Sequence, residues 1–321
     1  MCALQVRDNS GLQAFVNSGL QVRGQAGGGL FSIGDLSGAM ADRTEKYSYT
    51  ADSWAVVHDM LQDWEWGAAV GVGTKAYAEN DYRGYLDEYD PAADDWTART
   101  ARAGGVVRRS AAAEISGDLY VSCGERPGWS DTVRDTDAYD PATDSWDGGI
   151  TEAPAPARSC LAAASLDGEL YIYGGNTLYI YGQALPTRKA ACVAACDRYT
   201  PLGDSWAAMH DMLAARDSVC GSAIRDKAYV YGGFGSNGSW SDFDDCDEYD
   251  PASDGWTAKH AMTFRKYDAA ASTVKGRGVV HGGWTYSGPK HGECDAYLPS
   301  TDTWDSRDGY DSRMRHGSAA A

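Results

Sequence analysis

Short runs of small, apolar and polar residues alternate along most of the chain and are separated by turns. An Ala/Gly/Ser-rich run enters a tight turn, and a run rich in Val, Ile and Tyr leaves it. The clearest copies are residues 162–175, 221–233 and 270–283. β-Branched and aromatic residues favour strands, and turn residues between two such runs favour hairpins. Each copy therefore predicts a β-hairpin whose first strand is made of small residues.

A second hairpin is predicted after each of these. A tyrosine and a tryptophan recur seven residues apart, at intervals of 42 residues (Tyr47 to Tyr89) to 60 residues (Tyr139 to Tyr199). Pro and Asp between them are typical of a turn. The six pairs are Tyr47/Trp54, Tyr89/Trp96, Tyr139/Trp146, Tyr199/Trp206, Tyr249/Trp256 and Tyr297/Trp304. Six units of four short strands predict an all-β repeat protein.

Gly-Gly followed by this Tyr and Trp resembles the kelch repeat, over roughly residues 30–321. The resemblance implies a six-bladed kelch β-propeller with four antiparallel strands per blade, most like the propeller domain of kelch-like substrate adaptors. Small residues suit the innermost strands, which crowd around a propeller axis. Gly-Gly is complete in three units, at 174–175, 232–233 and 282–283, and is replaced by Gly34-Asp35, Asn80-Asp81 and Cys123-Gly124 in the others.

The two ends of the repeat predict how the ring closes. Residues 312–321 resemble the inner strand with which a repeat unit begins, whereas the first unit begins near Leu30 without such a strand. We therefore expect the C-terminal strand, residues 315–321, to complete blade 1 and remove the open sheet edges. Residues 1–29 form a separate N-terminal segment, either an extra strand pair or a tail, and residues 30–321 form the propeller.

Charge and cysteine usage narrow the partners and the compartment. The 321-residue chain has 46 acidic and 28 basic residues and a formal charge of −18. Such a surface repels phosphate backbones, which argues against nucleic acid. No run of 18 apolar residues predicts a membrane span. Eight cysteines without a CxxC pair indicate reduced thiols, and no signal peptide is recognisable, so we expect a cytoplasmic protein.

Basic residues recur near the starts of the predicted inner strands. In a closed propeller they would circle one mouth of the central channel and focus positive charge there. Arginine can bind carboxylates through two hydrogen bonds, although arginines at this position can also hold loops together. The set is Arg108, Arg109, Arg158, Arg216, Arg265, Lys266 and Arg315.

The loops after the Gly-Gly positions should surround the same mouth. The kelch-like adaptors bind their ligands with these two sets of loops, and this resemblance adds Asp217 and the aromatic loop residues as candidates. The predicted ligand-binding residues are Tyr82, Arg109, Arg158, Ser159, Arg216, Phe234, Lys266, Trp284, Arg315 and His316.

Metal and cofactor sites are not predicted. His58, His210 and His260 each follow a repeat tryptophan by four residues, so they belong to different blades and are interpreted as structural. Cys192 and Cys196, in the long insertion 176–197, could share a ligand only as a helical pair. The acidic stretch 241–248 lacks the spacing of a calcium-binding loop. We therefore expect no cofactor, no metal and no catalytic residue.

These observations predict a protein-interaction module that binds a protein or peptide, acidic or mixed in charge, at the basic mouth. One alternative is a kelch-type enzyme acting on a sugar or sugar acid, with Arg158, Arg216, Glu114 and Glu125 as its candidate residues. A ligandless or designed scaffold is the other.

Overall fold

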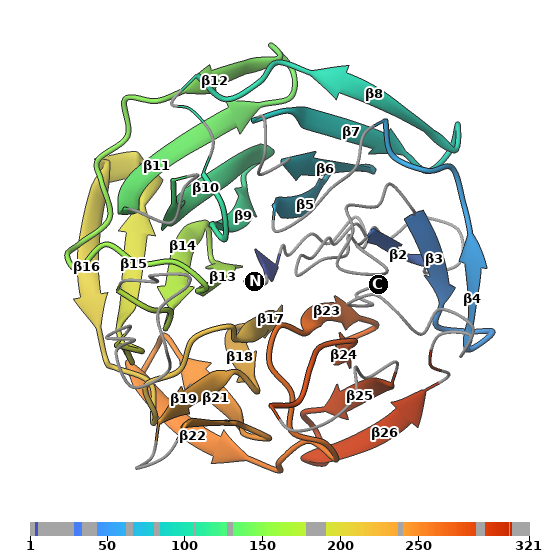
Figure 1. Ribbon diagram of the computed structural model, residues 1–321, viewed down its shortest axis with the longest axis vertical. Coiled ribbons are helices and arrows are strands. Elements are labelled where there is room, and N and C mark those ends of the chain that lie inside the picture. Colours follow the sequence, from blue (N-terminus) through green and yellow to red (C-terminus); the bar gives the residue numbers. More distant parts are fainter. Residues whose placement is uncertain are drawn as a thin grey trace.

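Six of the seven β-sheets in the described residues surround a central axis in the computed structural model (Figure 1). The structure describes residues 4–5, 29–33, 44–61, 67–79, 84–103, 105, 107–126, 131–177, 191–236, 240–286, 293–307 and 309. Each sheet runs outward from the axis, so that its first strand lies innermost and its last strand lies at the rim.

Five of the sheets contain a four-stranded antiparallel blade. Their strands, from the axis outward, are β5 (Ala68–Val72), β6 (Lys75–Glu79), β7 (Leu86–Asp90) and β8 (Asp95–Arg99); β9 (Ala111–Ile115), β10 (Asp118–Glu125), β11 (Thr132–Asp140) and β12 (Ser145–Asp147); β13 (Ala162–Leu166), β14 (Glu169–Tyr173), β15 (Cys196–Thr200) and β16 (Ser205–Met209); β17 (Cys220–Ile224), β18 (Lys227–Tyr231), β21 (Cys246–Asp250) and β22 (Gly255–Lys259); and β23 (Ala270–Val274), β24 (Arg277–His281), β25 (Cys294–Leu298) and β26 (Thr303–Arg307). A small ribbon of β19 (Phe234–Ser236) and β20 (Trp240–Asp242) extends from the fourth of these blades.

The sixth sheet has three strands: β2 (Gly29–Ile33), β3 (Thr44–Ser48) and β4 (Ser53–Val56). Leu30 lies opposite Tyr47, the register that Leu119 and Tyr139 adopt in the second and third strands of their blade. β2 is therefore a second strand, and the described residues supply no innermost strand to this sheet. The prediction of six four-stranded blades is corrected to five, and closure by residues 315–321 is not shown because that segment lies outside the described residues.

Small residues fill the innermost strands, as the sequence predicted. Ala112, Ala163 and Ala271 are all fully buried, because the inner strands of adjacent blades approach one another where only short side chains fit. The core is consequently a ring of contacts between neighbouring blades rather than a single central cluster.

A short strand from the N-terminal segment lies inside the ring. β1 (Leu4–Gln5) pairs in parallel with β13, with Leu4 opposite Ala163 and Gln5 opposite Ala164. Its Cα atoms also come within 8 Å of Cα atoms in β5, β9, β17 and β23. Figure 1 shows β1 at the centre of the ring. The N-terminal segment therefore contributes a strand to the channel.

At the rim, the repeat tyrosine and tryptophan face each other across the outer hairpin, as in Tyr249 and Trp256. The tyrosine hydroxyl donates a hydrogen bond to an aspartate five residues later, whose φ of 41–53° in all six turns is the left-handed region that Asp tolerates. The bonds are Tyr89–Asp94 (2.6 Å), Tyr139–Asp144 (2.7 Å), Tyr199–Asp204 (2.9 Å), Tyr249–Asp254 (2.8 Å) and Tyr297–Asp302 (2.7 Å), with Tyr47–Asp52 equivalent.

The same aspartate and tryptophan fasten each blade to the preceding one. His210 donates its backbone N–H to Asp254 Oδ1 (2.8 Å), and its carbonyl accepts from Trp256 Nε1 (2.8 Å). We call this paired contact the rim latch. It recurs at four further junctions, where the residues whose backbone N–H and carbonyl are both bonded are His58, Thr100, Thr151 and His260. The structural interpretation of the three repeat histidines is thus supported through their backbone groups.

At four of the five junctions, the rim latch lowers the pKa of its aspartate. The backbone N–H bond from the preceding blade is the main cause that lowers the pKa of Asp94, Asp144, Asp204 and Asp302. A carboxylate with a lowered pKa stabilises the folded state above its unfolded pKa of about 3.9. That contribution is lost as the pH falls through the lowered value.

Asp254→Ala should lower the free energy of unfolding by about 1–3 kcal/mol, because Tyr249 and the His210 N–H both lose their acceptor. Chemical denaturation followed by tryptophan fluorescence measures this change. Ser253→Ala, an exposed change in the same turn, is the control and should have little effect. Equal stability of the two variants would show that the latch contributes nothing.

Candidate functional site

One end of the channel is surrounded by paired connecting segments. In four blades, the residue three positions before the inner strand forms an isolated β-bridge with the residue that follows the Gly-Gly position. The bridges are Arg108–Glu125, Ser159–Asn176, Asp217–Phe234 and Tyr267–Trp284. We call these four bridges, which belong to four successive blades, the mouth.

Glycine is needed here because neighbouring blades approach closely. The N–H of Gly175 donates to the Arg216 carbonyl of the next blade (2.9 Å), and Gly124 and Gly233 donate to the corresponding carbonyls of Arg158 and Lys266. Gly174 has a φ of 65°, and a Cβ there would lie 2.6 Å from the Arg216 carbonyl oxygen. The Gly-Gly signature is therefore a blade-to-blade contact that fixes the mouth.

Three of the predicted basic residues lie beneath the mouth, where each is paired with a carboxylate of the chain. Arg158 and Arg216 form buried ion pairs with Asp197 and Asp247, and Lys266 Nζ lies 3.5 Å from Asp295 Oδ2. Their side chains are at most 1% exposed. The expected basic ring is thus a set of internal ion pairs, one position before each bridge, and the structural alternative accounts for these three residues.

Two blades depart from this ion-pair pattern. Val107 occupies the position of Arg158, and Arg102 reaches Asp137 from five residues upstream instead. In the β5–β8 blade, neither Oδ atom of Asp87 has a hydrogen-bond partner among the described residues, and burial raises the pKa of Asp87 to about 6. Trp64, which stands four residues before β5 as Arg158 stands four residues before β13, lies outside the described residues, as does Glu65.

One half of the mouth is polar. Arg109 Nε lies 3.5 Å from Glu125 Oε1, and burial raises the pKa of Glu125 to about 7. Ser159 Oγ lies 3.4 Å from Glu125 Oε2 and 3.2 Å from Asn176 Oδ1. Asn176 Nδ2 donates to Asp217 Oδ2 (3.1 Å), and burial also raises the pKa of Asp217 to about 7. A hydrogen-bonded chain therefore crosses three blades and ends in two carboxyl groups that titrate near neutrality.

The other half is aromatic. The ring centroid of Phe234 lies 5.3 Å from that of Tyr267 and 5.4 Å from that of Tyr286. Phe234, Tyr267 and Trp284 are partly exposed, and Tyr286 is 50% exposed. This side presents aromatic surface directly beside the polar chain.

Comparisons with known proteins bear on the fold. No protein-family model matches the chain, and no curated protein matches it. Among solved structures, the chain is similar to that of YjhT, with a TM-score of 0.69 and 11% sequence identity, covering 95% of this chain and 97% of YjhT. The fold is a β-propeller. At this identity the likeness concerns the fold alone.

The propeller geometry locates most of the predicted binding residues. Ser159, Phe234 and Trp284 lie at the mouth as expected, together with Asp217. Arg109 lies one residue after the bridging position, which Arg108 occupies. Arg109 is therefore equivalent to Cys160, and these two residues both have a positive φ. Tyr82, Arg315 and His316 lie outside the described residues.

Sequence reasoning missed two aromatic residues of the mouth. Tyr267 occupies the position of Ser159 and Asp217, and Tyr286 follows Trp284 by two residues. Aligning the four inner-strand starts residue by residue would have found Tyr267. Tyr286 carried no repeat signal, since its position depends on how the loop folds back onto Phe234.

The other candidates have structural surroundings in the propeller. The seven described cysteines are free. Cys192 forms a bridge with Asn176 and Cys196 begins β15, so the two are not a helical pair. In the stretch 241–248, Asp242 accepts from the Tyr286 N–H (3.0 Å) and Asp244 lies 3.6 Å from Arg265. Within the described ranges, no group of three His, Cys, Asp or Glu is placed to hold a metal ion.

The part of the chain that the structure describes contains no helix long and apolar enough to span a membrane.

Arg158→Ala should lower the free energy of unfolding by about 3–5 kcal/mol, because it leaves the Asp197 carboxylate buried without its cation. Denaturant unfolding measures the change. The matched control is Arg126→Ala, which removes an exposed pair with Asp135 (3.2 Å) and should cost about 0–1 kcal/mol. A stable Arg158→Ala protein with a normal unfolding curve would contradict the structural role.

Asp87→Asn should raise the free energy of unfolding by about 1–2 kcal/mol above pH 6, where the folded protein otherwise holds an unpaired charge. The folded pKa of about 6 exceeds the unfolded value of about 3.9, so the gain should shrink as the pH falls through this window and vanish near pH 4. Urea unfolding at pH 4, 5, 6 and 7.5 tests this. Asp95→Asn, on the exposed strand β8, is the control; a gain that does not depend on pH would rule out the unpaired charge as its cause.

Proposed function

We propose that this β-propeller is a binding module that holds an extended peptide or protein segment across the mouth. The observation that supports this most directly is the partly exposed aromatic group formed by Phe234, Tyr267, Trp284 and Tyr286. Aromatic residues that can be fully desolvated by a partner supply much of the affinity in protein interfaces. The adjacent polar chain from Glu125 to Asp217 would supply hydrogen bonds to backbone groups of the same partner.

The chemistry of the partner differs from that expected of a basic ring. Arg158, Arg216 and Lys266 are occupied by internal carboxylates, so they offer no charge to a ligand. Arg109 is balanced by Glu125. We therefore propose a partner of mixed character, with an apolar or aromatic side chain for the aromatic half and amide groups for the polar half.

The channel already accommodates an extended segment. β1 pairs in parallel with the inner strand β13, so main-chain groups at the propeller axis accept strand addition. Strand addition is a common way to bind extended peptides. β1 supports the proposal by example, since it is itself such a segment, supplied by the same chain.

We further propose that the propeller is of the kelch type and that residues 315–321 provide the inner strand of the β2–β4 sheet. The Gly-Gly contacts between blades and the six Tyr/Trp pairs support the first point. The second is supported by the register of β2, which leaves the innermost position of that sheet to another segment. The free thiols are those that a reducing compartment maintains, which supports a cytoplasmic location.

A second candidate function is an enzyme acting on a sugar or sugar acid at the mouth. The observation that favours it is the pair Glu125 and Asp217, whose pKa values of about 7 suit general acid–base catalysis. Other expected residues do not contribute. Glu114 Oε1 accepts from the Gly117 N–H (2.6 Å) in the turn at the far end of the hairpin, and Arg158 and Arg216 are buried in ion pairs.

Trp284→Ala should weaken binding of a selected peptide by about fivefold or more, because the loss of one central aromatic residue commonly costs more than 1 kcal/mol. Peptides would be selected from a displayed library against the full chain, and affinity would be measured by fluorescence anisotropy. Leu202→Ser, on a fully exposed leucine in the outer turn between β15 and β16, is the matched control and should leave affinity unchanged.

Two results would overturn the binding proposal. If no selected peptide loses affinity with Trp284→Ala, the aromatic half is not a binding surface. If sugar acids are turned over, and Glu125→Gln abolishes this turnover while peptides fail to bind, the enzyme is the correct function. Failure of both assays would leave a scaffold without a ligand at the mouth.

A further inference from the structure

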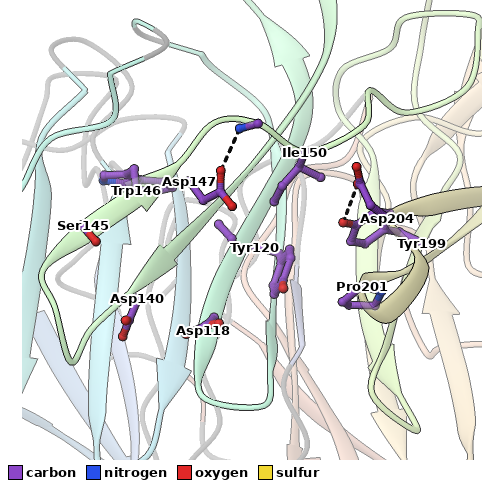
Figure 2. Close-up of a pocket in the computed structure, with 12 residues that line it drawn as sticks. Asp118, Tyr120, Asp140, Ser145, Trp146, Asp147, Ile150, Tyr199, Pro201 and Asp204 are labelled. Carbon is purple, nitrogen blue, oxygen red and sulfur yellow. Dashed lines mark hydrogen bonds between the residues drawn. The ribbon is translucent and has the colours of Figure 1, made fainter.

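A second cavity lies between two blades, away from the mouth. It occupies about 500 Å3 between the β9–β12 blade and the β13–β16 blade. Figure 2 shows its walls, with Trp146 and Asp140 on one side, Tyr199 and Asp204 on the other, and Tyr120 and Asp147 between them. The residues that define its chemistry are Asp118, Asp140, Asp147, Tyr120, Trp146 and Tyr199, while Asp204 of the rim latch completes the wall.

The cavity is structurally separate from the mouth. Asp118 begins β10 and Glu125 ends it, so the two sites lie at opposite ends of that strand. Asp140 and Asp204 belong to the outer-hairpin turns, which lie at the end away from the mouth. A ligand in this cavity would therefore bind independently of the proposed peptide.

The corresponding position in the β5–β8 blade is filled by the chain itself. Glu88 accepts from the Tyr77 hydroxyl (2.6 Å), from Lys75 Nζ (2.5 Å) and from Arg99 Nε (2.9 Å). Lys75 also lies 3.6 Å from Asp90. Two cations, two carboxylates and a tyrosine thus form one network against the next blade.

The β17–β22 blade repeats this arrangement. Tyr229 donates to Glu248 (2.5 Å), Lys259 Nζ lies 3.0 Å from the same carboxylate, and Lys227 Nζ lies 2.5 Å from Asp250. Strand pairing confirms the equivalence, since Tyr229 lies opposite Glu248 just as Tyr77 lies opposite Glu88.

The remaining two four-stranded blades keep a cation in the same region with different partners. Arg198, which lies opposite Tyr171, is 3.4 Å from Glu169. In the β23–β26 blade, Arg277 and Arg307 donate to the Tyr49 hydroxyl of the adjoining sheet, each at 2.7 Å. All four blades therefore neutralise this junction with a lysine or arginine of their own.

The β9–β12 blade has lost these groups. Tyr120 lies opposite Ala138, where Glu88 and Glu248 stand in the other blades. Asp118 occupies the position of Lys75 and Lys227 at the start of the second strand, and Gly149 follows Trp146 by three residues, as Arg99 follows Trp96. One acidic and two basic side chains have been replaced by Asp, Ala and Gly, and the cavity occupies the space that they would fill.

The carboxylates that remain have no cation among the described residues. Asp140 accepts hydrogen bonds from the Ala142 N–H and from Thr143 Oγ1, and Asp147 accepts one from the Gly149 N–H. All of these donors are neighbours in the sequence. Burial, followed by the nearby charge of Asp140, raises the pKa of Asp118. The ring centroids of Tyr120 and Tyr199 are 6.0 Å apart, so aromatic surface adjoins the unneutralised charge.

We propose that this cavity binds an organic cation, an alkylammonium or guanidinium group, in the place that a lysine or arginine of the chain occupies at the other blade junctions. Carboxylates would pair with the charged group, and the faces of the aromatic rings would contact it and its alkyl chain. The volume exceeds what a bare metal ion needs, and within the described ranges no acidic group here has metal-binding geometry.

Calorimetric titration of the full chain with spermidine and with agmatine tests the proposal. We expect saturable binding to one site, which Asp118→Lys weakens by at least about tenfold, since it restores the internal cation seen at Lys75 and Lys227. The substitution should also keep or raise thermal stability, because the new amine can pair with Asp140. A blocked Gly-Lys-Gly peptide, titrated in parallel, shows whether the site takes free amines or the side chain of a peptide.

The matched control is Asp226→Lys, which makes the same change of charge at an exposed turn beside Lys227. The protein carries a formal charge of −18, so unspecific attraction of cations would be reduced equally by both variants. Equal weakening of amine binding by both variants would overturn the proposal. It would also be overturned if Mg2+, at matched ionic strength, displaced the amine from the wild-type protein and from Asp118→Lys to the same extent. The absence of binding tighter than about 1 mM for all three probes would overturn it as well.

Discussion

The relative position of neighbouring blades depends on one outer-turn carboxylate at each of five junctions. In the best example, Asp254 Oδ1 takes the hydroxyl of Tyr249 from its own blade and the N–H of His210 from the preceding blade, while Trp256 holds the His210 carbonyl. Apolar packing between sheets is non-directional and leaves the angle between blades loosely defined. Hydrogen bonds to both backbone groups of a single residue fix that angle. Because this contact recurs around the ring, the angle that it sets between blades also determines the positions of the loops at the mouth and the spaces between blades.

A second set of contacts stabilises the inner part of the ring, and its irregularities coincide with the candidate sites. Arg158, Arg216 and Lys266 are each buried against an aspartate of the third strand. The β9–β12 blade breaks this rule at Val107 and also lacks the charged network between its outer strands and the next blade. At the first of these places Arg102 supplies the cation for Asp137 instead, whereas at the second no lysine or arginine of the described residues takes the place of the missing groups.

Much of the architecture could be predicted from the sequence, because the Tyr/Trp spacing and the Gly-Gly positions are imposed by contacts within and between neighbouring blades. The strand count failed at the first sheet, where the missing inner strand has no described counterpart. The mouth was harder. A basic residue before an inner strand has the same sequence signature whether it faces solvent or a buried aspartate, and Asp197 lies 39 residues after Arg158. Tyr286 and the one-residue offset of Arg109 depend on loop conformation, which repeat spacing does not encode.

The placement of β1 has a consequence for the order of assembly. Residues 4–5 are synthesised well before their partner strand β13, and their neighbours include inner strands as late as β23. The docked position is therefore created only after the later blades have formed and come together. Hydrogen exchange at the backbone amides of residues 4–5 would therefore report a late step of assembly, the pairing of β1 with β13.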